Sequence, residues 1–208
     1  MKTGSRIRLV TFDAYNTLFK PKGSLSGQYA HEASKLGLRV SSDAITHSFG
    51  KAYKQQLKRA PFYGIHQGMS TEQWWEELVY GTFLHSGVNK QELDKQFPIL
   101  FQSLYTRFNT KEGYCLFPDV LATLKELKQH GFIMGIISNS DERLVNVIES
   151  FKLDQYFDFV LPSCRAGYEK PRAEIFRKAL QLIDQHKFLP EDCLHVGDDV
   201  EKDYFGKK

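Results

Sequence analysis

Residues 7–18 read IRLVTFDAYNTL, and the first six of them form a short apolar stretch that ends at an acid. Ile, Leu, Val, Thr and Phe cluster here in the way that is typical of a buried β-strand. Asp13 follows at the carboxyl end of that predicted strand. In open α/β sheets, ligands bind at this edge because side chains that leave the strand ends converge on a crevice. The stretch therefore predicts a strand of an α/β sheet and places Asp13 where chemistry takes place.

The chain after Pro118 alternates between helical and strand-like patterns. Residues 132–137 read FIMGII, which predicts another buried strand. Pro171 suits the first turn of a helix. The full expected order is a helix at 118–130, a strand at 132–137, a helix at 141–152, a strand at 158–161, a helix after Pro171 and a strand at 193–196. Repeated strand-helix-strand units predict an α/β fold with a parallel, doubly wound, Rossmann-like sheet.

Between the first strand and this alternation the apolar residues follow helical spacing. The spacing begins at Leu25, Tyr29, Ala33 and Leu36. We expect four helices, at about 25–36, 42–58, 70–86 and 89–108, with Ser70 or Thr71 as an N-cap. The sequence therefore predicts an α/β core at 1–20 and 112–208 that is interrupted by an all-helical domain at 21–111.

The composition is that of a globular chain that is long enough to bury a core. Of its 208 residues, 41% are hydrophobic and 25% are charged, which excludes disordered and collagen-like chains. There are 28 Lys and Arg against 25 Asp and Glu, a net charge of +3, so we expect no nucleic-acid partner. No apolar run approaches the roughly 18 residues of a membrane span, and we read no signal peptide or membrane anchor.

The three cysteines, Cys115, Cys164 and Cys193, lie far apart and form no C-x-x-C pair. This usage is typical of reduced thiols, so we expect an intracellular, cytoplasmic protein. The sequence leaves the nucleus, the mitochondrion and the oligomeric state open.

Three more polar clusters fall at the predicted edge of the sheet. They are Ser138-Asn139, Lys170 in Gly-Tyr-Glu-Lys-Pro, and Gly197-Asp198-Asp199 with Asp203. Together with Asp13 they outline a phosphate and Mg²⁺ site. Each has a structural alternative when it is taken alone: a turn former for Asp13, a helix cap for Ser138, a solvated surface lysine for Lys170, and an ion-free loop for the acids.

In this order, the four motifs resemble those of the haloacid dehalogenase superfamily of hydrolases, over the whole chain. The matching stretches are TFDAYNTL at 11–18, IISN at 136–139, EKP at 169–171, and HVGDD at 195–199 with Asp203. The helical insertion resembles the cap domain of this superfamily. The segments Tyr63-Gly64 and Gln73-Trp74-Trp75 are similar to those of the haloacid dehalogenase-like hydrolase domain-containing protein 3 group.

The resemblance implies a role for each motif. Asp13 would be the nucleophile and would form an aspartyl intermediate. Mg²⁺ would be held by Asp13, Asp198 and the main-chain carbonyl of Tyr15. Two further acids of the metal set, Asp199 and Asp203, would hold metal-bound waters or orient Lys170. The substrate, a small phosphorylated metabolite, would be bound by Ser138, Asn139, Lys170 and Thr17. Of these, Ser138 and Lys170 would stabilise the transferring phosphoryl group, and Thr17 would also stabilise its loop by a hydrogen bond.

Tyr15 departs from the pattern of the superfamily phosphatases, which carry a second Asp at this position. That Asp protonates the leaving group and later activates water, which is worth typically about 10²- to 10⁴-fold in rate. The beginning Asp-x-Tyr-x-Thr-Leu also resembles the 2-haloacid dehalogenases, whose halide leaving group needs no proton. Two features speak against a 2-haloacid dehalogenase. Those enzymes need no metal, whereas Gly197-Asp198-Asp199 is acidic. They also carry an arginine early in the cap, where this chain has Tyr53-Lys54-Gln55.

A third alternative is a relative that has lost turnover and binds a phosphorylated ligand or a protein. The missing acid favours it, whereas the retained Asp13, Ser138, Lys170 and Asp198 speak against it, because buried charges without a function are costly.

The family adds a further strand and helix after the last motif, yet five residues follow Asp203. We therefore expect a fragment with a C-terminal strand and helix missing, and an exposed edge at the strand 193–196. We expect most aromatic residues of the helical domain to be packing residues.

Overall fold

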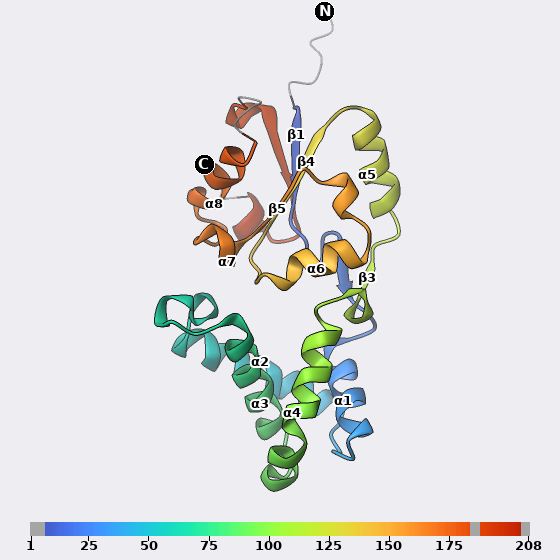
Figure 1. Cartoon of the computed structure of the whole chain (residues 1–208), viewed down its shortest axis with the longest axis vertical. Coiled ribbons are helices and arrows are strands. Elements are labelled where there is room, and N and C mark those ends of the chain that lie inside the picture. The colour runs from blue at the N-terminus through green and yellow to red at the C-terminus, as the bar shows by residue number, and fades with distance from the viewer. Residues whose placement is uncertain (1–6, 184–187, 205–208) are drawn as a thin grey trace, which may run out of the picture. The chain divides into compact units, whose positions relative to one another are not determined.

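The computed structural model describes residues 7–183 and 188–204, and the chain forms two compact units (Figure 1). The first unit joins Met1–Lys20 to Tyr114–Lys208, and the second runs from Pro21 to Gly113. The first unit holds the sheet and the second is built from helices. That the helical unit acts as a cap stays a prediction.

The core of the first unit is a parallel sheet in the order β5-β4-β1-β6. Its strands are β1 (Leu9–Phe12), β4 (Ile133–Ser138), β5 (Phe159–Pro162) and β6 (Cys193–Val196). Phe12 pairs with Ile136 on one side and with Val196 on the other. The predicted α/β fold with a parallel sheet is confirmed, and among the described residues β6 forms one edge of it.

Helices cover both faces of the sheet, so strand residues are buried on both sides. The helices of this unit are α5 (Val120–Gln129), α6 (Arg143–Ser150), α7 (Ser163–Ala166) and α8 (Ala173–Gln181). Val10, Phe12 and Ile136 share one apolar cluster with residues of α5 and α6, whereas Leu9 and Ile137 share another with α7 and α8. In Figure 1, α5 and α8 accordingly lie on opposite sides of the sheet. Such two-sided burial explains why these strands are nearly continuous apolar runs.

Two very short strands were not expected from the sequence. β2 (Phe19–Pro21) and β3 (Tyr114–Leu116) form a separate two-stranded sheet. Three residues are too few to show the alternation that marks a strand, and the proline in β2 argues against a strand when the sequence is read alone. The one-turn helix α7 and the 3₁₀ turns at 111–113, 154–156 and 190–192 escape the sequence for the same reason.

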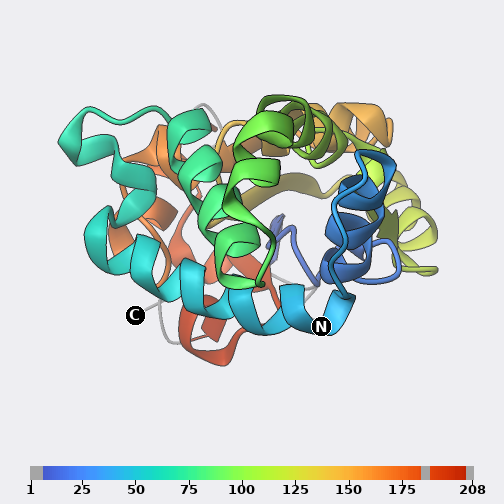
Figure 2. The ribbon, with the colours of Figure 1, turned by 90° about the horizontal axis from the view of Figure 1, so that it is seen from below.

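The helical unit consists of α1 (Leu25–Lys35), α2 (Ser42–Arg59), α3 (Thr71–His85) and α4 (Lys90–Arg107), with a 3₁₀ segment at Phe62–Gln67 (Figure 2). α2 packs on α1 and α3, and α4 packs on α3 and α1. Ser70 is the N-cap of α3, and its side chain and that of Gln73 form a capping box. The four helices lie where the spacing predicts them.

Some of the aromatic residues of this unit are fully buried, as expected for packing residues. Trp74 and Phe83 have no exposed surface, and the indole Nε1 of Trp74 donates to the carbonyl oxygen of Ala60 at 2.7 Å. Phe62, Tyr63 and Trp75 are only half-buried. Tyr63 and Trp75 nevertheless pack against the buried cluster that contains Trp74, so the prediction holds for them as well.

Two smaller expectations concern thiols and membranes. The three cysteines are free and half-buried. Within residues 7–183 and 188–204, no helix is long and apolar enough to cross a membrane.

Candidate functional site

The four motifs meet at the carboxyl ends of neighbouring strands. Asp13 follows β1, Ser138 ends β4, and Gly197 follows β6. The backbone N–H of Asp13 donates to the carbonyl oxygen of Val196 at 2.8 Å, which continues the pairing of β1 with β6 beyond the strands. Since parallel strands end at one edge, the sheet itself brings these positions together.

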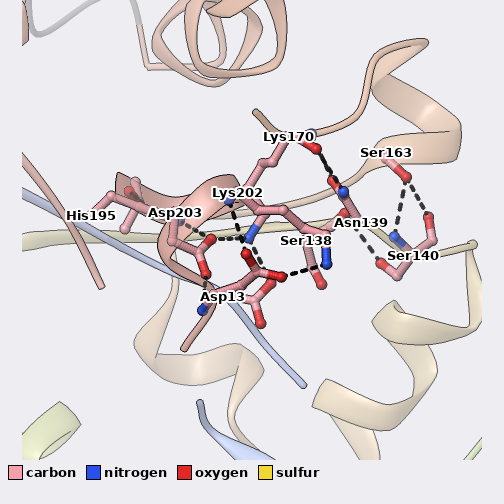
Figure 3. Close-up of polar contacts among 11 residues, drawn as sticks. Asp13, Ser138, Asn139, Ser140, Ser163, Lys170, His195, Lys202 and Asp203 are labelled. Carbon is pink, nitrogen blue, oxygen red and sulfur yellow. Dashed lines mark hydrogen bonds and ion pairs between the residues drawn. The ribbon is translucent and has the colours of Figure 1, made fainter. Parts of the chain in front are cut away.

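Lys170 lies between two of the acids (Figure 3). Its Nζ donates to Oδ1 of Asp13 at 2.7 Å and to Oδ1 of Asp203 at 2.6 Å. The residue is only 3% exposed, so it is not the solvated surface lysine of the structural alternative. Two carboxylates can compensate a buried ammonium group, which otherwise would be very costly to bury.

Asn139 holds the backbone of Lys170. Its side-chain Oδ1 accepts from the N–H of Lys170 at 2.7 Å, and its Nδ2 donates to the carbonyl oxygen of Lys170 at 2.9 Å. This reciprocal pair fixes where the lysine side chain begins. We expected the Asn139 amide to bind substrate, whereas in the structure these two atoms bind the main chain of Lys170.

Asn139→Asp should therefore lower the stability of the first unit. The carboxylate keeps the acceptor for the N–H but places a second oxygen against the carbonyl oxygen of Lys170, so we expect a loss of roughly 1–2 kcal/mol. Urea unfolding followed by circular dichroism measures it. Asn146→Asp, an exposed asparagine on α6, is the matched control. Equal stability of the two variants would contradict the holding role of Asn139.

Asp203 is the second partner of Lys170 and lies in a π-helical turn, Val200–Tyr204. Its Oδ1 also accepts from Nε2 of His195 at 3.0 Å, and its Oδ2 accepts from the N–H of Asp199 at 3.0 Å. Burial alone would raise the pKa of Asp203, but the hydrogen bonds from His195 and Lys170 outweigh it and hold the pKa below its usual range. Asp203 is therefore a carboxylate whose charge serves to hold Lys170.

Gly197 makes room for that carboxylate. A Cβ at position 197 would overlap the side chain of Asp203. The glycine is thus required by a close approach of the backbone to a side chain.

Asp13 is buried, with 7% of its surface exposed. This burial raises the pKa of its carboxyl group, and the attraction of Lys170 opposes the rise without cancelling it. A carboxylate that is poorly solvated and has a cation on one oxygen is a suitable nucleophile, because little water must be removed before it attacks.

Asp198 and Asp199 have different surroundings from Asp203. Asp198 is exposed, while the Oδ2 of Asp199 pairs with Nζ of Lys202 at 2.6 Å. The Oδ1 of Asp199 accepts from two backbone N–H groups of the following turn. These bonds lower the pKa of Asp199, with Lys202 as the largest contribution. Asp199 therefore closes its own turn.

The loop after Asp13 differs from expectation at Thr17. Its Oγ1 is buried and has no hydrogen-bond partner among the residues that the structure describes. The predicted hydrogen bond that stabilises the loop is thus not formed. The loop is instead held by the backbone, where the N–H of Leu18 donates to the carbonyl oxygen of Ala14 at 2.8 Å.

Tyr15 packs among aromatic rings. Its ring lies edge-on to Phe19 at 5.0 Å and to Tyr114 at 5.6 Å between centroids. Burial raises the pKa of Tyr114 to about 12, opposed by the nearby Arg143 and by a hydrogen bond with Tyr15. Phenols with such neighbours are poor proton acceptors at neutral pH.

The polar groups around Ser138 continue into the next turn. Ser138 is 1% exposed, and its carbonyl oxygen accepts from Oγ of Ser140 at 3.4 Å. Farther along, the guanidinium of Arg143 forms a buried ion pair with Asp141 at 2.7 Å. Asp141 and Arg143 belong to none of the four motifs, and their spacing of two at the start of a helix gives no signal in the sequence.

His195 belongs to the HVGDD motif, and the resemblance implies no role for it. It lies opposite Thr11 in the β1–β6 register, and its Nδ1 is 2.8 Å from the hydroxyl of Thr11. Side chains alternate between the two faces of β6, and this alternation places His195 on the same face as Thr11. Together with Asp203 eight residues later, this pattern is the signal from which a role for His195 could have been predicted.

Known proteins are similar to this chain over most of its length. A sequence model described as haloacid dehalogenase-like hydrolase matches residues 7–206. The haloacid dehalogenase-like hydrolase domain-containing protein 3 of Xenopus laevis is 37% identical over 198 residues, which cover 95% of this chain and 79% of the relative.

Two solved structures share the fold at low identity. One, described as a dehalogenase, is 21% identical, with a TM-score of 0.67 over 97% of this chain and 79% of the other. The other is the putative HAD-hydrolase YfnB from Bacillus subtilis bound to magnesium. It is 17% identical, with a TM-score of 0.71 over 97% of this chain and 84% of the other. From its motifs, its parallel sheet and these matches, the chain belongs to the haloacid dehalogenase-like hydrolases.

Proposed function

We propose that this hydrolase is a Mg²⁺-dependent phosphatase that acts on a small phosphorylated metabolite through an aspartyl-phosphate at Asp13. The observation that carries the proposal is the buried ammonium of Lys170, which lies 2.7 Å from Oδ1 of Asp13. It places a fixed positive charge beside the predicted nucleophile, where a transferring phosphoryl group would develop negative charge.

The reaction would take place in two displacements. In the first, an oxygen of Asp13 forms a bond to phosphorus while the bond to the leaving alkoxide breaks, which gives the aspartyl-phosphate. In the second, water attacks phosphorus, the bond to Asp13 breaks to regenerate the carboxylate, and the proton that the water loses passes to the released phosphate or to solvent. Lys170 would bind the phosphoryl oxygens in both steps, with Ser138 at the end of the neighbouring strand as a second donor.

The donor set at this edge fits Mg²⁺. The cation takes oxygen ligands, keeps several waters, and is usually bound through one or two carboxylates together with substrate phosphates. Asp13 and Asp198 follow the adjacent strands β1 and β6 and supply two such carboxylates. Among the described residues no three or more His, Cys, Asp and Glu side chains are clustered to hold a metal, so Mg²⁺ would need further ligands from water or the substrate. Asp13 and Asp198 would hold the cation, which would offset the charge between carboxylate and phosphate.

Tyr15 restricts the range of substrates. A leaving group that departs without a proton would react, while a poor leaving group would need a proton from water or from the substrate itself. We therefore expect faster turnover with aryl than with alkyl phosphates, because an aryl oxide is the better leaving group.

The activity test uses p-nitrophenyl phosphate, which has a good leaving group. We expect phosphate release with Mg²⁺ and its loss in excess EDTA, with recovery when Mg²⁺ is added back. Chloride release from 2-chloropropionate in EDTA would contradict the proposal and support a 2-haloacid dehalogenase. That enzyme is the second candidate because its halide leaving group needs no proton, which suits Tyr15 at the position of the usual acid. Failure of both assays, together with a negative screen of phosphorylated metabolites, would support the non-catalytic alternative.

A further inference from the structure

A histidine lies behind the pair of Lys170 and Asp203. His195 is 8% exposed, its Nε2 lies 3.0 Å from Oδ1 of Asp203, and its Nδ1 lies 2.8 Å from the hydroxyl of Thr11. The same Oδ1 accepts from Nζ of Lys170 at 2.6 Å. Thr11, His195, Asp203, Lys170 and Asp13 thus form one buried chain of hydrogen bonds. Figure 3 shows the part of this chain from His195 to Asp13.

The chain of bonds fixes which ring nitrogen carries a proton. A carboxylate only accepts hydrogen bonds, so Nε2 of His195 must be the donor to Asp203. In the neutral ring Nδ1 is then an acceptor. The hydroxyl of Thr11 lies 2.8 Å from Nδ1 and 3.4 Å from the carbonyl oxygen of Leu194, so Nδ1 is the nearer acceptor for its proton. Thr11 is opposite His195 in the parallel register, so the sheet itself supplies this partner.

Two donors share one oxygen of Asp203, and this has a consequence for Lys170. The hydrogen bond from His195 takes up part of the negative charge on Oδ1, so this oxygen attracts the ammonium of Lys170 less than a lone carboxylate would. The bond also fixes the rotation of the carboxylate, together with the N–H of Asp199 on Oδ2. The ammonium of Lys170 is thereby held between Asp203 and Asp13, and its positive charge stays available to Asp13.

We propose that His195 is a positioning residue that acts through Asp203 to fix Nζ of Lys170 and to keep its charge available at Asp13. The kinetic part of this inference rests on the proposed phosphatase activity. The geometric part does not, because it concerns bonds among residues of the chain itself. Partners of this kind, one step removed from the reacting groups, typically affect activity by 10- to 100-fold.

The kinetic test compares His195→Phe with His195→Gln. Phe removes the donor, and a cavity of about 230 Å³ beside the ring, lined by Leu9, Ile137 and Phe176 among others, has room for the change. Gln keeps an N–H donor near the position of Nε2. With p-nitrophenyl phosphate we expect His195→Phe to lower kcat by about 10- to 100-fold with KM within about threefold, and His195→Gln to recover most of kcat.

Leu194→Ala, a half-exposed neighbour on the same strand, is the matched control for damage to β6, and its kcat should stay near that of the unchanged protein. A purely structural role would lower the melting temperature of His195→Phe and His195→Gln alike and leave kcat in place. That result, or a His195→Gln variant as slow as His195→Phe, would overturn the proposal.

A second readout needs no turnover. Nitrogen-15 NMR of the full chain should show a bound proton on Nε2 of His195, and a ring with Nδ1 as its only protonated nitrogen would overturn the proposal. The ammonium signal of Lys170 should shift in His195→Phe but not in Leu194→Ala. If p-nitrophenyl phosphate is not hydrolysed but the NMR results are as expected, the phosphatase proposal fails while the positioning of Lys170 stands. An unshifted Lys170 signal in His195→Phe would overturn the positioning role itself.

Discussion

Asp13→Asn is expected to abolish turnover, with a loss on the order of 10⁴-fold or more, because the amide cannot form the covalent intermediate. The change preserves shape, and the amide oxygen can still accept from Nζ of Lys170 at the position of Oδ1, which lies at 2.7 Å. Lys170 also keeps Asp203 as its anionic partner. The variant should therefore fold, and phosphate release in the presence of Mg²⁺ measures the effect.

The control for this variant is Asp154→Asn, which makes the same change at an exposed acid of the first unit. It should keep full activity, and circular dichroism should show both variants folded. Substantial activity in folded Asp13→Asn would remove Asp13 as the nucleophile and leave it a binding or structural role.

Lys170→Met is expected to lower both activity and stability. The ammonium is the shared partner of Asp13 and Asp203, and its removal leaves two buried carboxylates close together without a compensating charge. Breaking a buried ion pair from one side typically costs about 3–5 kcal/mol in the free energy of unfolding. Turnover should fall by about 10²- to 10³-fold, the usual effect of removing one donor that stabilises transition-state charge.

The double variant Lys170→Met with Asp203→Asn separates the two effects. Neutralising Asp203 removes one of the uncompensated charges, so urea unfolding should show recovery of part of the lost stability, while turnover stays low because no ammonium remains at Asp13. A single variant as stable as the unchanged protein would contradict the buried ion pair. Recovery of activity in the double variant would contradict the role of Lys170 in the reaction.

The parallel sheet could be predicted from the sequence because strands buried on both faces read as continuous apolar runs, as at residues 132–137. The helices α1 to α4 could be predicted because each has an apolar stripe and a polar N-cap, such as Ser70 for α3. β2 and β3 could not, since they depend on pairing across a long stretch of chain that no local pattern reports.

The candidate site was predictable as a set of positions but not as a set of contacts. The order of strands indicates that Asp13, Lys170 and Asp203 fall at one edge, and the structure joins them through Nζ of Lys170. The roles assigned to them stay predictions. The holding of Lys170 by Asn139 and the contact of His195 with Asp203 depend on side-chain orientation, which only the packed structure determines.

The most direct test of the covalent mechanism is to trap the intermediate on Asp13. The protein would be mixed with Mg²⁺ and p-nitrophenyl phosphate, quenched in acid within the first turnovers and treated with borohydride, which reduces an acyl phosphate to an alcohol. Mass spectrometry of the peptide that contains residue 13 should then show homoserine at position 13, and no such product without substrate or in Asp13→Asn. Steady phosphate release with an unmodified Asp13, or with the phosphoryl group on another residue, would contradict the account.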